Sequence, residues 1–322
     1  MKILIILPNW LGDAIMSTPT IEALAKEYPQ AQFTFIGSYV AIEALKQHPL
    51  CHKAIIDNTK KASSRLLATI QLAKSLPTFD LALTFRKNIY ASLLLRFTKT
   101  AIRVGRKTWF NKILLTKNIT FVKNRHLVLN YFEFIKNIVS KTSQADVLQL
   151  HILRHTFNKP SLGINPGATY GSAKRWYPKE FAKVAQKFAN NYDIVIFGGP
   201  TEVEMGEEIS QELESLGVSN YTNLAGTTSV QELCSHIGGC QVFLTNDSGP
   251  MHIAAAYQVP TVAIFGPTKH TETSQWMNKK SEIVRLDMDC SPCMKRSCPL
   301  GHHECMKNIT ADMVIEAMKK IV

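Results

Sequence analysis

The sequence predicts an α/β protein built from two doubly wound domains in tandem. Short apolar runs of strand length alternate with segments of helical period along most of the chain. The same strand–helix order starts again near the middle of the sequence, and 322 residues are enough for two such domains. Strands that alternate with helices form parallel sheets with helices on both faces.

The first domain is expected to span residues 1–155. It opens on the buried strand Ile3–Leu7, and a helical pattern runs from Ala14 to Tyr28. The elements that follow are, in order, the strand Gln32–Ile36, the helix Tyr39–Gln47, the strand Ala54–Ile56, the helix Arg65–Leu76 and the strand Phe79–Phe85.

The second domain is expected to span residues 156–322, after a linker at His151–Pro160. Its strands are predicted at Leu162–Asn165, Asp193–Phe197, Gln241–Thr245 and Pro260–Phe265. Its helices are predicted at Pro178–Ala189, Glu202–Leu216, Val230–Ile237, Met251–Tyr257 and Asp312–Ile321. Ligands of such folds bind at the carboxyl ends of the strands, so the residues just after each strand are the candidates for function.

Several protein classes are excluded by composition. The apolar opening stops at Pro8 without a small-residue cleavage site, and no apolar run reaches the roughly 20 residues that a membrane-spanning helix needs. The cysteines number seven, an odd count in a large chain, which argues against a secreted disulfide scaffold. We therefore expect a cytoplasmic protein.

Positive charge is concentrated in the first half of the chain. Residues 1–155 hold 22 Lys and Arg against 8 Asp and Glu, a net +14, whereas residues 156–322 have a net −2. The segment 81–132 contains eleven cations and no acidic residue. Because a solvated surface normally mixes both signs, this favours contact with a polyanion or an anionic membrane surface over a merely solvated basic face.

The first candidate site is the turn Pro8–Ala14, which follows the first predicted strand. Gly12 permits a tight turn or the close approach of a ligand. Asp13 lies at or near the start of a helix, where two roles are open: a functional carboxylate at the strand end, or a plain N-cap.

Two further loops follow strands of the second half. Residues 165–176 read Asn-Pro-Gly-Ala-Thr-Tyr-Gly-Ser-Ala-Lys-Arg-Trp, and such small residues can present backbone N–H groups to phosphates while Lys174 adds charge. Residues 245–252 read Thr-Asn-Asp-Ser-Gly-Pro-Met-His, at a helix N-terminus suited to an anion. Taken alone, this segment is better explained structurally, with Asp247 or Ser248 as a helix cap and His252 as a core histidine.

The last candidate is a set of four cysteines near the C-terminus. Cys290 and Cys293 form a Cys-x-x-Cys pair, and Cys298 and Cys305 follow with His302 and His303 between them. The set is rich enough to hold zinc, but its spacing is not that of a standard zinc finger. Free thiols without a metal are favoured slightly, and the tail is expected to be dispensable for chemistry.

Together these segments resemble the glycosyltransferase family that contains the lipopolysaccharide heptosyltransferases. The resemblance covers nearly the whole chain and is carried by residues 7–19 (Leu-Pro-Asn-Trp-Leu-Gly-Asp-Ala-Ile-Met-Ser-Thr-Pro), 165–168, 174–176, 246–256 and the Cys-Ser-Pro-Cys tail. It implies a GT-B fold, two Rossmann-like domains facing a cleft, with the last helix (310–322) crossing back to pack on the first domain. One departure is Pro250, where the family usually has Leu.

The resemblance also implies roles for particular residues. It implies that Asp13 is the catalytic base of an inverting transfer of heptose from ADP-heptose to a lipid A–core acceptor, the second heptose onto heptosyl-Kdo-lipid A. The donor would bind at Pro166, Gly167, Ala168, Lys174, Asp247, Ser248, Gly249 and His252, and the acceptor at Asn9, Trp10, Arg103, Arg106 and Lys107. No cofactor or essential metal and no nucleic-acid partner is expected. The basic segment would bring the enzyme to the cytoplasmic face of the inner membrane as a peripheral protein.

Two other functions remain open at this point. A nucleotide-sugar epimerase of similar architecture would need no basic acceptor surface. A non-catalytic regulator that binds nucleotide sugars would bind ADP but transfer no sugar.

Overall fold

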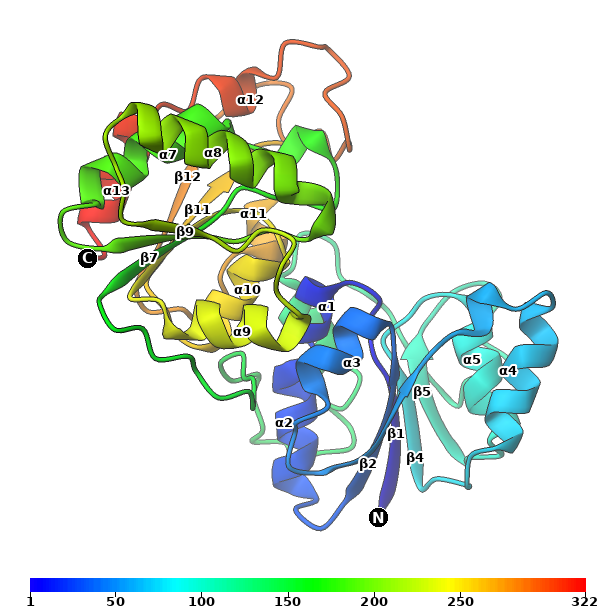
Figure 1. Ribbon diagram of the computed structural model, residues 1–322. Helices are drawn as coiled ribbons and strands as arrows, with labels where there is room; N and C mark the ends of the chain where they lie inside the picture. The colour runs from blue at the N-terminus through cyan, green and yellow to red at the C-terminus, as the bar shows by residue number, and fades with distance from the viewer. The chain divides into compact units, whose positions relative to one another are not determined.

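The computed structural model describes all 322 residues and divides them into two compact units, Met1–His151 and Ile152–Val322. The division falls a few residues before the expected boundary at 155/156. Each unit contains one six-stranded sheet in which every strand pair is parallel. The predicted α/β class with two doubly wound sheets is thereby confirmed (Figure 1).

The sheet of the first unit has the strand order β3-β2-β1-β4-β5-β6. Its strands are β1 (Lys2–Ile6), β2 (Gln32–Gly37), β3 (Cys51–Ile56), β4 (Leu81–Thr84), β5 (Ile102–Arg106) and β6 (Lys117–Ile119). The chain runs outward from β1 to β3 and then returns to place β4 on the other side of β1. The order therefore reverses between β1 and β4, and this switch point is where doubly wound sheets open a crevice for ligands.

Helices cover both faces of this sheet (Figure 1). They are α1 (Leu11–Met16), α2 (Thr18–Glu27), α3 (Tyr39–Leu45), α4 (Arg65–Lys74), α5 (Ile89–Phe97) and α6 (Leu127–Phe132), with a 3₁₀ turn at Thr59–Lys61. The single helix expected from Ala14 to Tyr28 is wrong, because α1 and α2 are separate. The hydroxyl of Ser17 donates to the carbonyl of Ala14 at 2.7 Å, and Pro19 has no N–H to continue the helix.

The sheet of the second unit has the order β12-β11-β10-β7-β8-β9, with its switch point between β7 and β10. Its strands are β7 (Ser161–Asn165), β8 (Asp193–Ile196), β9 (Tyr221–Asn223), β10 (Val242–Asn246), β11 (Thr261–Phe265) and β12 (Ser281–Arg285). Its helices are α7 (Pro178–Phe188), α8 (Val203–Ser215), α9 (Val230–Gly239), α10 (Gly249–Ala256), α11 (His270–Thr273), α12 (Glu304–Lys307) and α13 (Ala311–Lys319), with 3₁₀ turns at Ser172–Lys174 and Pro200–Glu202.

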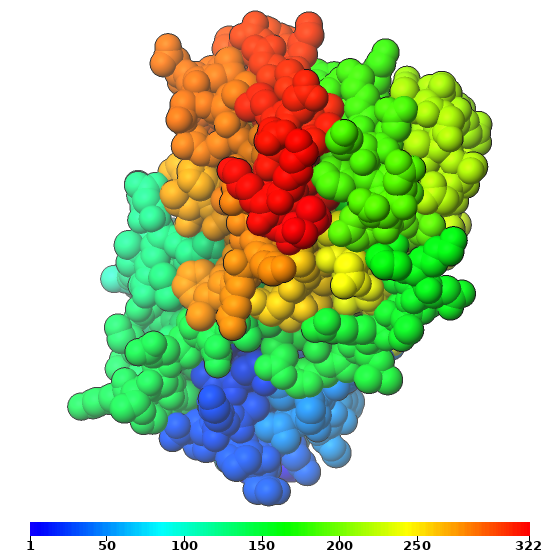
Figure 2. All heavy atoms as spheres, turned by 90° about the vertical axis from the view of Figure 1, so that its left-hand side faces the viewer, coloured from blue at the N-terminus to red at the C-terminus, as the bar shows by residue number.

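The last helix corrects one expectation. The resemblance implied that it packs on the first domain, but α13 buries its apolar face, including Val314 and Met318, in the core of the second unit. There it packs on α7, β11 and β12, and the indole N–H of Trp176 donates to the carbonyl of Ile309 at 3.0 Å just before it. In Figure 2 the red C-terminal segment lies against orange and green segments of this same unit. Burial of this apolar face holds the helix there.

Candidate functional site

A cavity of about 780 Å³ opens in the first unit at the carboxyl ends of β1 and β4. This is the switch point of the sheet, so the position agrees with the rule for doubly wound folds. The cavity is lined by Pro8, Asn9, Trp10, Asp13, Ser38, Asp57, Lys60, Arg65, Phe85, Arg86, Lys87, Asn88, Arg106, Phe121, Leu127 and Tyr131. The lining side chains thus include five cations and two carboxylates, which suits an anionic ligand.

Asp13 lies in this lining, as the third residue of α1. The N-cap of that helix is Trp10, and no side chain makes a capping hydrogen bond there, so Asp13 is not the N-cap. Its Oδ1 accepts a hydrogen bond from the hydroxyl of Tyr131 at 3.2 Å. It is the acidic residue of the first turn of α1.

Tyr131 orients the Asp13 carboxylate through this hydrogen bond. It belongs to α6, its side chain is buried, and its ring packs edge-on against Phe85 with centroids 5.2 Å apart. Burial, and then the neighbouring Asp13 carboxylate, raise the pKa of Tyr131 well above its usual value. The phenol therefore stays protonated and donates to Asp13 at any physiological pH.

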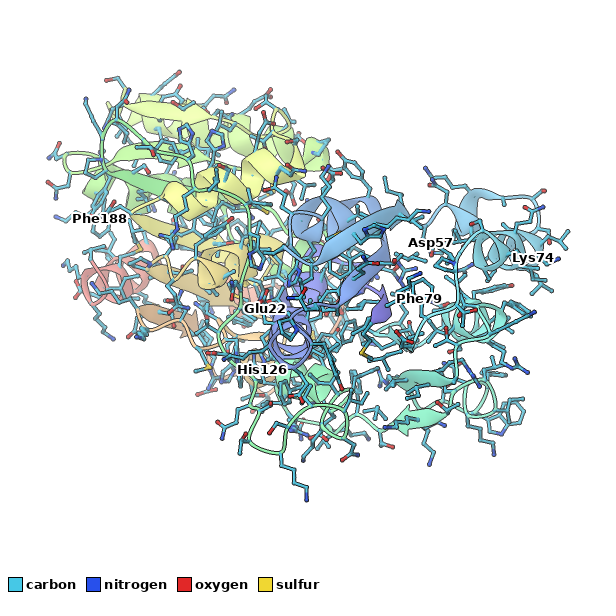
Figure 3. All side chains as sticks on the ribbon, turned by 90° about the horizontal axis from the view of Figure 1, so that it is seen from below. Glu22, Asp57, Lys74, Phe79, His126 and Phe188 are labelled. Atoms are coloured by element: carbon cyan, nitrogen blue, oxygen red, sulfur yellow. The ribbon has the colours of Figure 1, made fainter.

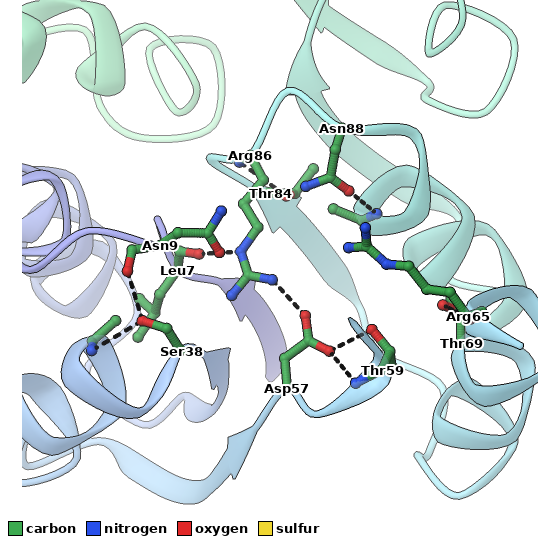
Figure 4. Close-up of polar contacts among 12 residues, drawn as sticks. Leu7, Asn9, Ser38, Asp57, Thr59, Arg65, Thr69, Thr84, Arg86 and Asn88 are labelled. Carbon is green, nitrogen blue, oxygen red and sulfur yellow. Dashed lines mark hydrogen bonds and ion pairs between the residues drawn. The ribbon is translucent and has the colours of Figure 1, made fainter. Parts of the chain in front are cut away.

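Arg86 is the most deeply buried cation of the cavity, with only 6% of the residue exposed. Its Nε donates to the carbonyl of Leu7 at 2.7 Å, and its Nη1 pairs with Oδ2 of Asp57 at 2.5 Å (Figure 4). Its Nη2 is buried and has no hydrogen-bond partner. A buried guanidinium nitrogen without an acceptor, in the wall of a cavity, is available to an anionic ligand.

Asp57, the residue directly after β3, holds the Arg86 guanidinium in place through this ion pair. It also accepts hydrogen bonds from the backbone N–H of Thr59 at 3.1 Å and from its hydroxyl at 2.7 Å. Burial acts to raise the pKa of Asp57, but the hydrogen bonds from Thr59 and the charge of Arg86 outweigh it and hold the pKa below its usual value. The carboxylate is therefore ionised and the pair stays intact near neutral pH.

Neither Arg86 nor Asp57 is among the residues that the sequence predicted for a site. Arg86 follows the predicted strand Phe79–Phe85 directly, and that strand-end position was the available signal. Asp57 follows the short strand at residues 54–56 in the same way.

The residues predicted for the acceptor divide into two groups. Asn9, Trp10 and Arg106 line the cavity, and the guanidinium of Arg106 stacks over the ring of Phe121 at 4.1 Å. Arg103 and Lys107 are not among the lining residues. Arg103 donates to the carbonyls of Thr100 and Leu114, at 2.5 and 2.9 Å, so its guanidinium supports the loop after β5.

In the second unit, the two predicted donor loops are tied together at the switch point between β7 and β10. The side-chain amide of Asn246 donates to the carbonyl of Pro166 at 2.6 Å, and its oxygen accepts the backbone N–H of Trp176 at 3.2 Å. Asn165 donates to the carbonyl of Gly167 at 3.2 Å. The loops after β7 and β10 thus form one connected structure.

Position 167 has room only for a glycine. A Cβ atom at this position would lie 2.0 Å from Cδ of Glu202, a buried side chain whose carboxylate accepts the N–H of Gly199 at 2.8 Å. Any larger residue would displace Glu202. The glycine therefore holds the loop of residues 165–168 close to the start of α8.

Lys174 points back into its own unit. Its Nζ lies 2.5 Å from Oδ2 of Asp247 and 3.1 Å from the Asp247 carbonyl. The same carboxylate oxygen accepts the hydroxyl of Thr268 at 2.6 Å, and Asp247 is almost fully buried. Asp247 therefore positions the Lys174 ammonium at the junction of the two loops.

The start of α10 has the remaining predicted donor residues. Ser248 is its N-cap but makes no capping hydrogen bond with its side chain, and Gly249 is the first helical residue. Pro250 fits here because the N–H groups of a first helical turn have no partner within the helix. His252 is buried in the interior, with 3% exposed, and Ala168 is buried as well.

The four C-terminal cysteines are all free. Cys305 is buried in α12, and burial together with the charges of the other three raises its pKa to about 11. Cys298 has a lowered pKa because backbone N–H groups, that of His303 foremost, point at its sulfur. That this tail is dispensable for chemistry stays a prediction.

Another cluster of possible metal ligands lies in the first unit and consists of Glu22, His48 and His151 (Glu22 is labelled in Figure 3). Each residue offers one ligand atom, and the three atoms lie within 4.8 Å of one another. Nδ1 of His48 accepts the backbone N–H of Leu50 at 3.1 Å, so the neutral ring carries its proton on Nε2, which faces Glu22. A metal needs a free lone pair at that nitrogen. The tautomer thus favours a hydrogen-bonded cluster around the Glu22 carboxylate.

Comparisons with known proteins agree with one another. Residues 69–304 match the family model described as glycosyltransferase family 9 (heptosyltransferase). The chain is 41% identical to "Lipooligosaccharide heptosyltransferase 2" of Campylobacter jejuni serotype O:2, over 100% of this chain and 98% of the relative. It is 28% identical to "Lipopolysaccharide heptosyltransferase 2" of Escherichia coli K12, over 100% and 99%.

Among solved structures, the fold is similar to that of E. coli ADP-heptose lps heptosyltransferase II. The TM-score is 0.81 at 26% sequence identity, and the match covers 100% of this chain and 98% of that one.

Proposed function

Because the chain belongs to glycosyltransferase family 9, the heptosyltransferases, we propose that it transfers heptose from ADP-heptose to the lipopolysaccharide inner core. The position proposed is the second heptose, added to heptosyl-Kdo-lipid A. The names of its relatives, lipooligosaccharide and lipopolysaccharide heptosyltransferase 2, support that step.

The observation that carries the proposal is the cavity of the first unit. A carboxylate, Asp13, and a buried guanidinium with a free nitrogen, Arg86, line the same space at the switch point of the sheet. The acceptor is a sugar hydroxyl within a molecule that bears phosphate and acidic sugar groups. The Asp13 carboxylate can accept the proton of the hydroxyl, and the Arg86 guanidinium can bind the anionic groups.

The proposed chemistry is a single displacement with inversion. Asp13 takes the proton of the acceptor hydroxyl as the hydroxyl oxygen forms a bond to the anomeric carbon of the donor. The bond from that carbon to the diphosphate oxygen breaks, and ADP departs with the bonding electron pair. The Tyr131 hydroxyl, 3.2 Å from Oδ1, keeps the carboxylate oriented for the transfer.

The donor is proposed to bind to the second unit, at the loops after β7 and β10. Lys174 and the backbone N–H groups after Ser248 would stabilise the charge that develops on the departing diphosphate. These groups supply positive potential without a metal ion, so we propose that transfer needs no essential metal.

The enzyme is proposed to work at the cytoplasmic face of the inner membrane. No helix in the structure has both the length and the apolar character that crossing a bilayer requires. The basic segment 81–132 offers charge to an anionic surface, and each Lys or Arg near such a surface is worth about 1 kcal/mol.

One assay separates the candidate activities. The protein is incubated with ADP-heptose, with and without a heptose-deficient core acceptor, and the release of ADP is followed. Release that depends on the acceptor, and that persists in the presence of a chelator, supports a metal-independent transferase. Conversion of the donor without acceptor would support an epimerase, and ADP binding without turnover a regulator.

Replacing Lys174 by Ala is expected to weaken ADP binding in calorimetry by about tenfold, since one charged contact to the diphosphate is lost. Asp247, buried and without its cation, would then face the same anion. The double variant Lys174→Ala with Asp247→Asn is the control, because it removes that repulsion and should recover part of the affinity. Unchanged ADP affinity in the single variant would show that Lys174 only joins the loops.

A further inference from the structure

Three large apolar side chains project from the loop between β5 and β6 of the first unit. Trp109 is 80% exposed, Phe110 60% and Ile113 80%. The rings of Trp109 and Phe110 contact each other edge to face, with centroids 5.0 Å apart. We refer to these three residues as the apolar tip. Exposed apolar groups gathered in this way mark interaction sites more often than isolated ones do.

The loop that carries the tip is fixed by its inward-facing residues. Asn111 is fully buried and its side-chain amide donates to the carbonyl of Lys87 at 3.1 Å. Leu115 is buried beside Gly105, where even a Cβ atom would lie 2.8 Å from the leucine. Arg103 also donates to the carbonyl of Leu114 at 2.9 Å. The exposure of the tip is therefore set by the fold around it.

The charge around the tip has one sign. Lys107 and Lys112 are exposed on the same loop, and Lys117 and Lys123 follow it. These four lysines form no ion pair, and no acidic residue occurs between positions 81 and 132. Aromatic and aliphatic groups flanked by unpaired lysines are the combination that binds the headgroup region of an anionic bilayer.

The tip lies at the same edge of the sheet as the cavity. Arg106, the last residue of β5, lines the cavity, and the loop of the tip begins at the next residue. A surface that binds this loop would therefore lie close to the cavity that Asp13 and Arg86 line.

We propose that the apolar tip inserts into the interfacial layer of an anionic membrane while the neighbouring lysines bind the lipid headgroups. This rests on the proposed function only in that the acceptor is linked to lipid. Insertion would place the acceptor cavity at the bilayer surface. Insertion of apolar side chains adds a hydrophobic contribution to membrane binding. Salt does not screen this contribution, whereas it does screen the attraction between the basic segment and the lipid charge.

The first test measures binding of the full chain to vesicles of phosphatidylglycerol and phosphatidylethanolamine. The variant Trp109→Ser, Phe110→Ser, Ile113→Ser is expected to bind these vesicles at least about tenfold more weakly than the wild type. At high salt the variant should lose its remaining binding, whereas the wild type should keep part of its own. The control Leu67→Ser, Leu153→Ser, Leu300→Ser removes side chains that are 60%, 86% and 62% exposed and should bind like the wild type. Equal thermal unfolding midpoints would exclude misfolding.

The second test locates the tryptophan. Lipids brominated on their acyl chains should quench part of the protein fluorescence, and Trp109→Phe should bind as well as the wild type but lose that quenching. Absence of quenching in the wild type, or a tip variant that binds as the wild type does, would overturn the proposal. So would a tip that instead supports self-association in sedimentation, or retention of a protein partner with no effect on vesicles.

The same variants separate this proposal from the proposed function. Transfer to a deacylated, water-soluble core acceptor should be unchanged in the tip variant, because no membrane is involved. Loss of transfer in the wild type with that acceptor would contradict the function and leave the vesicle results standing.

Discussion

The variant Asp13→Asn is expected to lower the turnover of acceptor-dependent ADP release by roughly 10²–10⁴-fold, the usual contribution of a general base. The amide oxygen of asparagine can still accept the hydrogen bond from Tyr131 that the carboxylate accepts at 3.2 Å. The first turn of α1 also loses no cap, because the cap is Trp10. The loss should therefore fall on kcat, with ADP affinity by calorimetry unchanged.

Tyr131→Phe is the matched control for this prediction. It keeps the carboxylate and removes only the hydroxyl that orients it, so turnover should fall by far less than in Asp13→Asn. If Asp13→Asn turned over at a rate near that of the wild type, Asp13 would have no part in proton transfer.

The variant Arg86→Met is expected to lower the free energy of unfolding by about 3 kcal/mol, because it leaves a buried carboxylate without its cation. The Asp57 side chain is only 11% exposed, and the two remaining hydrogen bonds from Thr59 do not neutralise it. The KM for the acceptor should rise as well, since Arg86 lines the cavity and its positive charge is lost. Chemical denaturation and steady-state kinetics measure the two effects.

A second substitution separates the two effects. Adding Asp57→Asn to Arg86→Met removes the unpaired charge and should restore much of the stability, but it cannot restore the cation of the cavity. The KM for the acceptor should therefore stay high in the double variant. Recovery of both quantities together would mean that Arg86 acts only through the fold and does not bind the acceptor.

The sequence was sufficient to predict the central strands. β1 and β10 contain the apolar runs Ile3–Ile6 and Val242–Leu244, and all of β7 is buried too, because both faces of these strands are covered. Apolar runs of this kind are visible without any alignment. Strands β5 and β12 were not predicted, and neither were the two short edge strands β6 and β9. Each has three residues, and their side chains are partly exposed and largely polar, so neither length nor periodicity distinguishes them from loops.

The same limit applies to the site. Asp13, Asn9 and Trp10 follow the first strand in one short segment, so a rule about strand ends finds them together. Asp57 and Arg86 are 29 residues apart and meet only because β3 and β4 lie on opposite sides of the β1–β2 pair and end at the same edge of the sheet. Pairing of that kind depends on the sheet order, which local sequence patterns do not contain.

The cluster around Glu22 has a consequence for the acid tolerance of the first unit. Burial acts to raise the pKa of Glu22, but the hydrogen bond from His151 and the nearby ring of His48 lower it from 4.5 to about 2. Because the folded-state value is the lower one, the stabilisation is complete above pH 4.5 and is lost as the pH falls from there towards 2. His151, at 2.8 Å from Glu22, is the last residue of this unit. Acidification should therefore loosen the chain where it leaves the first unit, and Glu22→Gln should do so already at neutral pH, as proteolysis at residues 151–160 would reveal.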